Sequence, residues 1–178
     1  MLDIKTTILI TEEQIQKKIK EIALSLNKKF KNEQVIAIGT LKGAFAFYSD
    51  LIRSLSCRVL CDFCETSRYG KKKEPSKEVK LTMDTTLNIS GKHILLVEDI
   101  VDQGYTLNFL QSHLKNHNPL SLTTVVLIAK PQKIRERKCQ VDYIGFEVEA
   151  SSFLVGYGLD YQEQFRHLPY IAEIQSLN

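Results

Sequence analysis

The sequence predicts an α/β fold in which helices flank a mostly parallel β-sheet. Short aliphatic runs alternate along the chain with amphipathic stretches of helix length, which is the order that βαβ units produce. The run at residues 94–97 is entirely aliphatic, as expected of a strand that is buried on both faces of a parallel sheet. At 178 residues, the chain is predicted to form one domain whose core needs no metal or disulfide.

The composition argues against several other classes of protein. The net charge of +3 is the small difference between 24 basic and 21 acidic residues, so it gives little reason to expect nucleic acid or an anionic membrane as a partner. The apolar runs are too short to cross a membrane, and the first residues lack the apolar segment of a signal peptide. The four cysteines do not form the double C-x-x-C pattern of a zinc site. We therefore expect a soluble, cytoplasmic protein with reduced thiols.

A strand and a helix are predicted at the start of the chain. Residues 6–10 form the strand, and Thr11 with Gln14 three positions later has the pattern of a capping box, which begins a helix. Six apolar side chains then fall on one helical face: Ile15, Ile19, Ile22, Ala23, Leu26 and Phe30. We expect this face to cover the sheet.

The middle of the chain repeats the alternation of strands and helices. The predicted elements are a strand at 35–38, a glycine-containing loop at 39–43, a helix at 44–55, and strands at 57–64 and 79–83. The polar segment between the last two strands, residues 65–77, contains Gly70 and Pro75 and is predicted to be a mobile loop.

The second half follows the same order. After the strand at 94–97, the predicted elements are a helix with Leu107, Leu110 and Leu114 on one face, strands at 122–129 and 143–148, and a glycine- and aromatic-rich tail at 153–170. Residues 116–119 end the helix. His113 and His117 have a spacing that suits metal ligands, but without an acidic third ligand nearby we favour an exposed helix face.

Carboxylates follow the central strand directly. Glu98 and Asp99 close the aliphatic run, and Asp102 lies three residues further on. Ligands bind at the carboxyl ends of strands in open α/β sheets, and a loop that opens a helix there offers backbone N–H groups to a phosphate. The sequence therefore predicts a site for a phosphate and a sugar that carries a cation. The alternatives are a solvated acidic turn for Glu98 and Asp99, and a helix N-cap for Asp102.

The residues from Val97 to Thr106, VEDIVDQGYT, resemble the signature of type I phosphoribosyltransferases, which bind 5-phosphoribosyl 1-diphosphate. Further motifs occur in the order seen in hypoxanthine-guanine phosphoribosyltransferases: Leu41-Lys42-Gly43-Ala44, Ser67-Arg68-Tyr69-Gly70, Lys130-Pro131, Phe153-Leu154-Val155-Gly156-Tyr157-Gly158-Leu159-Asp160 and Phe165-Arg166. The resemblance implies a type I phosphoribosyltransferase-like fold with a small hood from about residues 1–10 and 146–178. It also implies a homodimer or homotetramer.

The resemblance implies roles around a purine base. Asp102 would face N7 of the purine and take part in proton transfer. Lys130 would donate to the 6-oxo group, which favours hypoxanthine or guanine over adenine because an amino group offers no matching acceptor. Phe153 would stack on the purine and Leu154 would offer backbone groups to its edge. Alternatively, Phe153 is an ordinary core aromatic residue.

The resemblance also implies roles around the phosphates of the sugar. The 5′-phosphate would be bound by the loop that begins the helix, which comprises Gln103, Gly104, Tyr105 and Thr106. Lys42 and Gly43 would bind the diphosphate in a loop that contains a non-proline cis peptide bond; the alternative is a plain turn that needs Gly43. Arg166 would act in catalysis by neutralising the diphosphate, although it could instead be a surface ion-pair partner.

Magnesium is the cofactor that the resemblance implies. Glu98 and Asp99 would bind it, directly or through water, while accepting hydrogen bonds from the ribose hydroxyls. Asp160 would bind a second Mg²⁺ through water; the alternative is again a surface ion pair.

The polar segment 65–77 resembles the lid of this family, with Ser67 and Tyr69 near the diphosphate; closure would exclude water. The chain differs from the usual family residues at three positions. Arg68 stands where members usually carry Ser, Gln103 where they carry Ser or Thr, and Ala129 where they carry Asp. These differences and the basic run 71–73 leave room for a second hypothesis, an RNA-binding regulator that senses nucleotides on the same fold. The first hypothesis is a purine salvage transferase that converts hypoxanthine or guanine and 5-phosphoribosyl 1-diphosphate to IMP or GMP and diphosphate. We favour this enzyme, since a pyrimidine sensor would not need Lys130 with Phe153 and Asp160.

Overall fold

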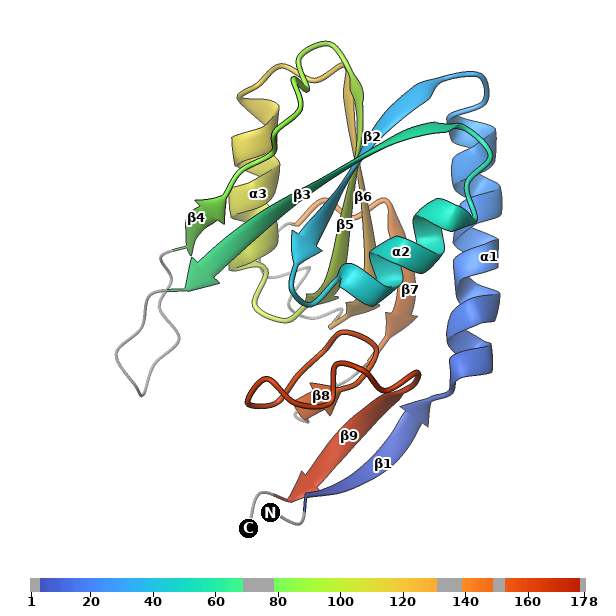
Figure 1. Cartoon of the computed structure of the whole chain (residues 1–178), viewed down its shortest axis with the longest axis vertical. Helices are drawn as coiled ribbons and strands as arrows, with labels where there is room; N and C mark the ends of the chain where they lie inside the picture. Colours follow the sequence, from blue (N-terminus) through green and yellow to red (C-terminus); the bar gives the residue numbers. More distant parts are fainter. Residues whose placement is uncertain (1–3, 69–78, 131–138, 149–152, 177–178) are drawn as a thin grey trace.

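The computed structural model describes residues 4–68, 79–130, 139–148 and 153–176. These residues form a large β-sheet, a small β-sheet and three helices (Figure 1). The strands are β1 (Lys5–Ile10), β2 (Gln34–Leu41), β3 (Arg58–Arg68), β4 (Val79–Met83), β5 (His93–Val101), β6 (Ser121–Ala129), β7 (Tyr143–Glu147), β8 (Phe153–Val155) and β9 (Ile171–Ser176). The helices are α1 (Glu12–Lys29), α2 (Phe45–Arg53) and α3 (Tyr105–Lys115).

The large sheet has the strand order β4-β3-β2-β5-β6-β7. All of its pairings are parallel except that of the edge strand β4 with β3, so the predicted mostly parallel sheet is confirmed. Residues 94–97 of β5 are fully buried. Leu95 and Val97 pack in the core beneath α1 and α2, whereas Ile94 and Leu96 pack in the core beneath α3. The entirely aliphatic run thus reflects a strand that is covered on both faces.

The start of α1 confirms the predicted capping box. The Thr11 backbone N–H donates to the Gln14 side chain at 2.8 Å, and the Gln14 backbone N–H donates to Thr11 Oγ1 at 3.3 Å. The predicted apolar face is buried throughout: Ile15, Ile19, Ile22, Ala23, Leu26 and Phe30 are each at most 5% exposed. The face packs on the sheet together with α2.

Strands β3 and β5 run further than the apolar pattern predicted, because backbone pairing continues past the aliphatic residues. β5 includes Glu98 and Asp99 and ends at Val101, with Glu98 opposite Val126 of β6. The two carboxylates therefore lie inside the strand and not after it, and the solvated acidic turn is wrong. β3 continues through residues 65–68, which pair with β4. The first four residues of the predicted mobile loop are therefore strand, and its remainder at 69–77 lies outside the described residues.

The small sheet has the order β1-β9-β8, with both pairings antiparallel. It joins the two ends of the described chain, and it lies beside the edge of the large sheet toward which the parallel strands point (Figure 1). Residues 143–147 form β7 of the large sheet, so residues 146 and 147 lie outside the small sheet. Among the described residues, no helix is both long and apolar enough to span a membrane.

Candidate active site

A cavity of about 260 Å³ lies where the carboxyl ends of β5 and β6 meet the segment that begins with β8. Its lining comes from three separate parts of the sequence: Asp99, Ile100, Asp102, Lys130, Phe153, Leu154, Leu159 and Asp160. Most of these are residues that the sequence analysis predicted as site residues. The residues from β5 and β6 converge because parallel strands end at a common edge, where ligands of open α/β sheets bind. The others come from β8 and the loop that follows it, which close the cavity from the side of the small sheet.

Lys130 and Asp102 form an ion pair in the lining of this cavity. The Lys130 ammonium donates to Asp102 Oδ1 at 2.6 Å, and the Lys130 side chain is only 17% exposed. Its backbone is held by β5, since the Lys130 N–H donates to the carbonyl oxygen of Val101 at 3.3 Å. Asp102 is not the helix N-cap, because Gly104 occupies that position. A cation beside a carboxylate can pair with adjacent polar atoms on the edge of a heterocycle.

Phe153 and Leu154 line the same cavity from β8. Phe153 is 51% exposed and is not part of the hydrophobic core, so the core-aromatic alternative is wrong. Its ring packs edge-on against Tyr161 at a centroid distance of 5.5 Å and an interplanar angle of 82°. Leu154 is 6% exposed and lies opposite Glu173 of β9. An exposed aromatic ring at the mouth of a cavity can stack on a flat ligand.

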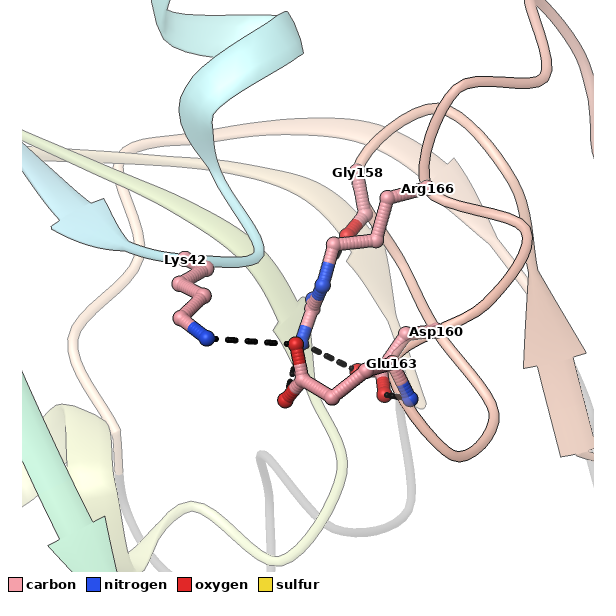
Figure 2. A network of polar contacts seen from close by, with 5 residues as sticks. All are labelled: Lys42, Gly158, Asp160, Glu163 and Arg166. Carbon is pink, nitrogen blue, oxygen red and sulfur yellow. Dashed lines mark hydrogen bonds and ion pairs between the residues drawn. The ribbon is translucent and has the colours of Figure 1, made fainter.

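Arg166 is held beside the cavity by a network of polar contacts (Figure 2). Its guanidinium lies 2.7 Å from Asp160 Oδ1 and donates to the carbonyl oxygen of Gly158 at 2.8 Å. The Arg166 and Asp160 side chains are 19% and 28% exposed, so the pair is partly buried and not a surface contact.

Glu163 joins the network to the loop after β2, and the sequence analysis did not single it out. Its carboxylate lies 3.3 Å from the Arg166 guanidinium and 3.2 Å from the Lys42 ammonium, and its backbone N–H donates to Asp160 at 2.9 Å (Figure 2). Glu163 is 66% exposed. No motif carried a signal for it, because only the folded tail brings this glutamate to Lys42.

The turn at Lys42 and Gly43 is shaped against the site. The Leu41–Lys42 peptide bond is cis, as the resemblance implied. A Cβ atom at Gly43 would lie 1.9 Å from Asp99 Oδ2, and a Cβ atom at Gly158 would lie 2.0 Å from the Gly43 carbonyl oxygen. Gly43 is therefore needed for the close approach of the Asp99 carboxylate, which a plain turn would not require.

Asp99 and Asp160 place two carboxylates on the cavity wall. Burial, which is the strongest influence, raises the pKa of Asp99 to about 6; backbone hydrogen bonds and the Arg166 charge oppose the rise, and Asp160 adds to it. Two such carboxylates suit Mg²⁺, which binds through one or two carboxylates and keeps water or phosphate oxygens as its other ligands. Glu98 is 6% exposed and is not among the residues that line the cavity.

The residues that precede and begin α3 are those of the predicted phosphate loop, Gln103 to Thr106. Gly104 adopts a left-handed conformation with φ of 74°, which glycine reaches without the cost of a Cβ atom. Tyr105 and Thr106 begin the helix, and its first turn contains no acidic side chain. The partial positive charge of this helix N-terminus can therefore attract a phosphate without competition from a carboxylate in that turn. Gln103 is partly buried beside Gly104.

The remaining predicted residues are only partly described. Ser67 lies in β3 opposite Lys80 of β4, and it is not among the residues that line the cavity. Tyr69 and Pro131 lie outside the described residues. Ala129 ends β6 fully buried and is paired on one side with Val101, so the strand keeps its register without the acid that is usual there.

Known protein families and sequences show which family the chain belongs to. The model of the phosphoribosyl transferase domain matches residues 7–162. The chain belongs to the phosphoribosyl transferase family. Within this family, it is 40% identical over 168 residues to the hypoxanthine-guanine phosphoribosyltransferase of Bacillus subtilis, covering 94% of this chain and 92% of the relative. It is 36% identical over 170 residues to the hypoxanthine phosphoribosyltransferase of Haemophilus influenzae, covering 94% of each.

Solved structures of phosphoribosyl transferases share the fold. A crystal structure of a hypoxanthine-guanine phosphoribosyltransferase from Bacillus anthracis matches with a TM-score of 0.87 and 42% identity, over 97% of this chain and 99% of that chain. A hypoxanthine phosphoribosyltransferase from Staphylococcus aureus matches with a TM-score of 0.88 and 36% identity, over 97% and 92%. The type I phosphoribosyltransferase-like fold is thereby confirmed, and these relatives and structures lend no support to the RNA-binding hypothesis.

Proposed function

We propose that this phosphoribosyl transferase is a purine salvage enzyme. It converts hypoxanthine or guanine and 5-phosphoribosyl 1-diphosphate to IMP or GMP and diphosphate. The ion pair of Lys130 and Asp102 in the cavity carries the proposal, because a donor beside a carboxylate complements the neighbouring O6 acceptor and N7–H donor of an oxopurine that is protonated at N7. The names of the relatives from Bacillus subtilis and Haemophilus influenzae support the same substrates.

The base would bind between Phe153 and the ion pair. Lys130 donates to O6 of the purine, and Phe153, which is half exposed, stacks on the ring. Adenine carries an amino group in place of O6, so it would leave the partly buried Lys130 ammonium without that acceptor. Selection against adenine therefore follows from the missing acceptor at position 6 of the base, opposite a Lys130 donor that Asp102 holds in the cavity, and not from the size of the base.

Asp102 would accept a proton from the base during transfer. The N9 lone pair forms the bond to C1 of the ribose as the bond from C1 to the diphosphate oxygen breaks. The proton that the purine must lose passes from N7 to Asp102 Oδ. The Lys130 ammonium beside Asp102 orients this carboxylate toward the base.

The diphosphate would leave between Lys42 and Arg166. Glu163 holds both of these cations, so it must release them when the donor substrate binds. Glu163 and Lys42 can rearrange at little cost, because both are exposed and exposed ion pairs contribute little, whereas Asp160 and the Gly158 carbonyl oxygen keep Arg166 in place. Lys42 and Arg166 then stabilise the negative charge that develops on the leaving diphosphate.

The resemblance implied Glu98 and Asp99 as ligands of one Mg²⁺ and Asp160 as a ligand of a second. Because Glu98 is buried and does not line the cavity, we propose that Asp99 and Asp160 are the carboxylates that would hold Mg²⁺. When bound, Mg²⁺ would neutralise part of the negative charge of the diphosphate. We further propose that Glu98 supports the ribose site from inside β5 and that the loop from Gln103 to Thr106 binds the 5′-phosphate. Ser67 and Tyr69 would contribute from the lid.

The chain would act as a single domain, with the small sheet as its hood. As in other members of the family, the enzyme would be a cytoplasmic homodimer or homotetramer. Its partners would be the sugar diphosphate, the purine and the nucleotide product.

A base panel tests the proposed function. The protein is mixed with Mg²⁺, 5-phosphoribosyl 1-diphosphate and one of hypoxanthine, guanine, xanthine or adenine, and nucleotide is measured by chromatography. We expect product with hypoxanthine or guanine and none above background with adenine. We also expect Lys130→Met to lower kcat/KM for hypoxanthine at least about tenfold, since a hydrogen bond to a charged group is lost. Absence of nucleotide with every base would overturn the proposal.

A further inference from the structure

We infer a second metal site, built from Asp84, His113 and His117, that binds a divalent transition ion such as Zn²⁺. One ligand atom from each residue lies within 4.8 Å of the others. The sequence analysis favoured an exposed helix face for the two histidines because it found no acidic third ligand nearby. The fold supplies one, since Asp84 follows β4 and reaches His113 across 29 positions of the chain.

The three side chains already face one another. His113 Nε2 lies 3.0 Å and 2.9 Å from the two carboxylate oxygens of Asp84. The His117 ring lies edge-on to the His113 ring at a centroid distance of 5.0 Å. Ligand atoms of a tetrahedral zinc ion are about 3.4 Å apart, given bonds of about 2.0–2.2 Å. Rotation of partly exposed side chains suffices to bring the three atoms to that spacing.

Backbone contacts around the cluster limit how far Asp84 can move. The buried Asp62 accepts hydrogen bonds from the backbone N–H groups of Thr86 at 2.8 Å and Leu87 at 2.9 Å. These bonds fix the segment after Asp84 against β3. His113 is fixed on α3, where its ring is parallel to that of Phe109. Both sides of the site are therefore positioned before any ion binds, which lowers the cost of binding.

The donor set selects the class of ion. Two imidazole nitrogens and one carboxylate oxygen suit Zn²⁺, Ni²⁺ or Cu²⁺, whereas Mg²⁺ prefers oxygen ligands alone. Three protein ligands leave a fourth position for water or another small ligand. The site is thus chemically distinct from the carboxylates Asp99 and Asp160 in the cavity.

The site is also separate in space from the phosphate loop. His113 lies eight residues after Tyr105, the first residue of α3, which corresponds to about 12 Å along a helix. A bound ion would connect α3 to the segment that follows β4, which runs beside this helix (Figure 1). We therefore expect the ion to stabilise the folded chain without entering the transfer reaction.

Calorimetry with the full chain tests the site. The protein is freed of metal with a chelator and titrated with ZnCl₂ in a buffer that contains excess MgCl₂. We expect one saturable Zn²⁺ site per chain, with affinity at least about tenfold weaker in His117→Ala and in Asp84→Asn, since each variant removes a ligand. His167→Ala and Cys61→Ser remove an exposed histidine and an exposed thiol outside the cluster, so they should bind as the wild type does.

Two further readouts separate a bound ion from adventitious contact. Imidazole ¹⁵N spectra should shift for His113 and His117 on addition of Zn²⁺, and not for His93 or His167. At a Zn²⁺ concentration of 100 times Kd, the unfolding temperature should rise by about 5–10 °C, and MgCl₂ should not reproduce this rise. Equal Zn²⁺ affinity in wild type, His117→Ala and Asp84→Asn, or no saturable binding to the wild type, would overturn the inference.

Discussion

Replacing Gly43 by alanine should damage the site with little effect on the fold. The new Cβ atom would lie 1.9 Å from Asp99 Oδ2 and 2.6 Å from Asp99 Cγ. An ordinary contact needs about 3.5 Å, so the carboxylate or the turn must move by about 1.5 Å. A displacement of about 1 Å at a catalytic site can cost about 10²-fold in rate. We therefore expect kcat/KM to fall by about 10²-fold, which corresponds to about 2.7 kcal/mol of transition-state stabilisation.

Gly91→Ala is the matched control for this variant. Gly91 has φ of +66°, and a Cβ atom there would meet nothing within 4 Å. Its replacement adds only backbone strain of about 1–2 kcal/mol, far from the cavity. Steady-state kinetics with hypoxanthine and circular-dichroism melting are measured for both variants. The reasoning is refuted if Gly43→Ala folds and its kcat/KM stays within about threefold of the wild-type value, because the turn would then tolerate the side chain.

Three further predictions follow from the polar contacts. Asp102→Asn should still accept a hydrogen bond from Lys130 but cannot take a proton, so kcat should fall by about 10²-fold with little change in KM; steady-state kinetics showing an unchanged kcat would remove Asp102 from the mechanism. Glu163→Gln should lower KM for 5-phosphoribosyl 1-diphosphate by about twofold to fivefold, because it no longer competes for the two cations; a higher KM would show that Glu163 assists binding. Burial opposes ionisation of Asp50, but hydrogen bonds from Tyr157, Gln16 and Arg53 hold the pKa of Asp50 below its usual value. Its charge therefore stabilises the fold above about pH 4 and stops doing so as the pH falls below that value. Urea unfolding should show Asp50→Asn less stable than the wild type by about 1–2 kcal/mol at pH 7 and by less at pH 3; an equal difference at both pH values would contradict this.

The aliphatic runs and the capping box were sufficient to predict the order of the elements. Residues 94–97 could only be buried on both faces, and Thr11 with Gln14 located the start of α1 within one residue. The ends of the strands were harder to predict from the sequence, because backbone hydrogen bonding between strands does not depend on whether a side chain is polar. β5 therefore continues through Glu98 and Asp99, and β3 continues through residues that appeared to be loop.

The candidate site was predictable where a motif carries both the backbone geometry and the side chain. Asp102, Lys130, Phe153 and Asp160 line one cavity, as their motifs implied. Contacts between an isolated residue and a distant segment were not predictable. Glu163 reaches Lys42 across 121 positions, and Asp84 reaches His113 across 29. Contacts at such sequence separations produce no recognisable pattern in the neighbouring residues.

Reaction stoichiometry measures the proposed transfer most directly. The protein is incubated with Mg²⁺, hypoxanthine and 5-phosphoribosyl 1-diphosphate, and IMP and diphosphate are quantified from the same sample. One molecule of each should form for every hypoxanthine consumed, with both falling to background when a chelator removes the metal. Diphosphate release without IMP would mean that water, and not the purine, attacks the sugar, and it would contradict the assignment of the cavity to an oxopurine.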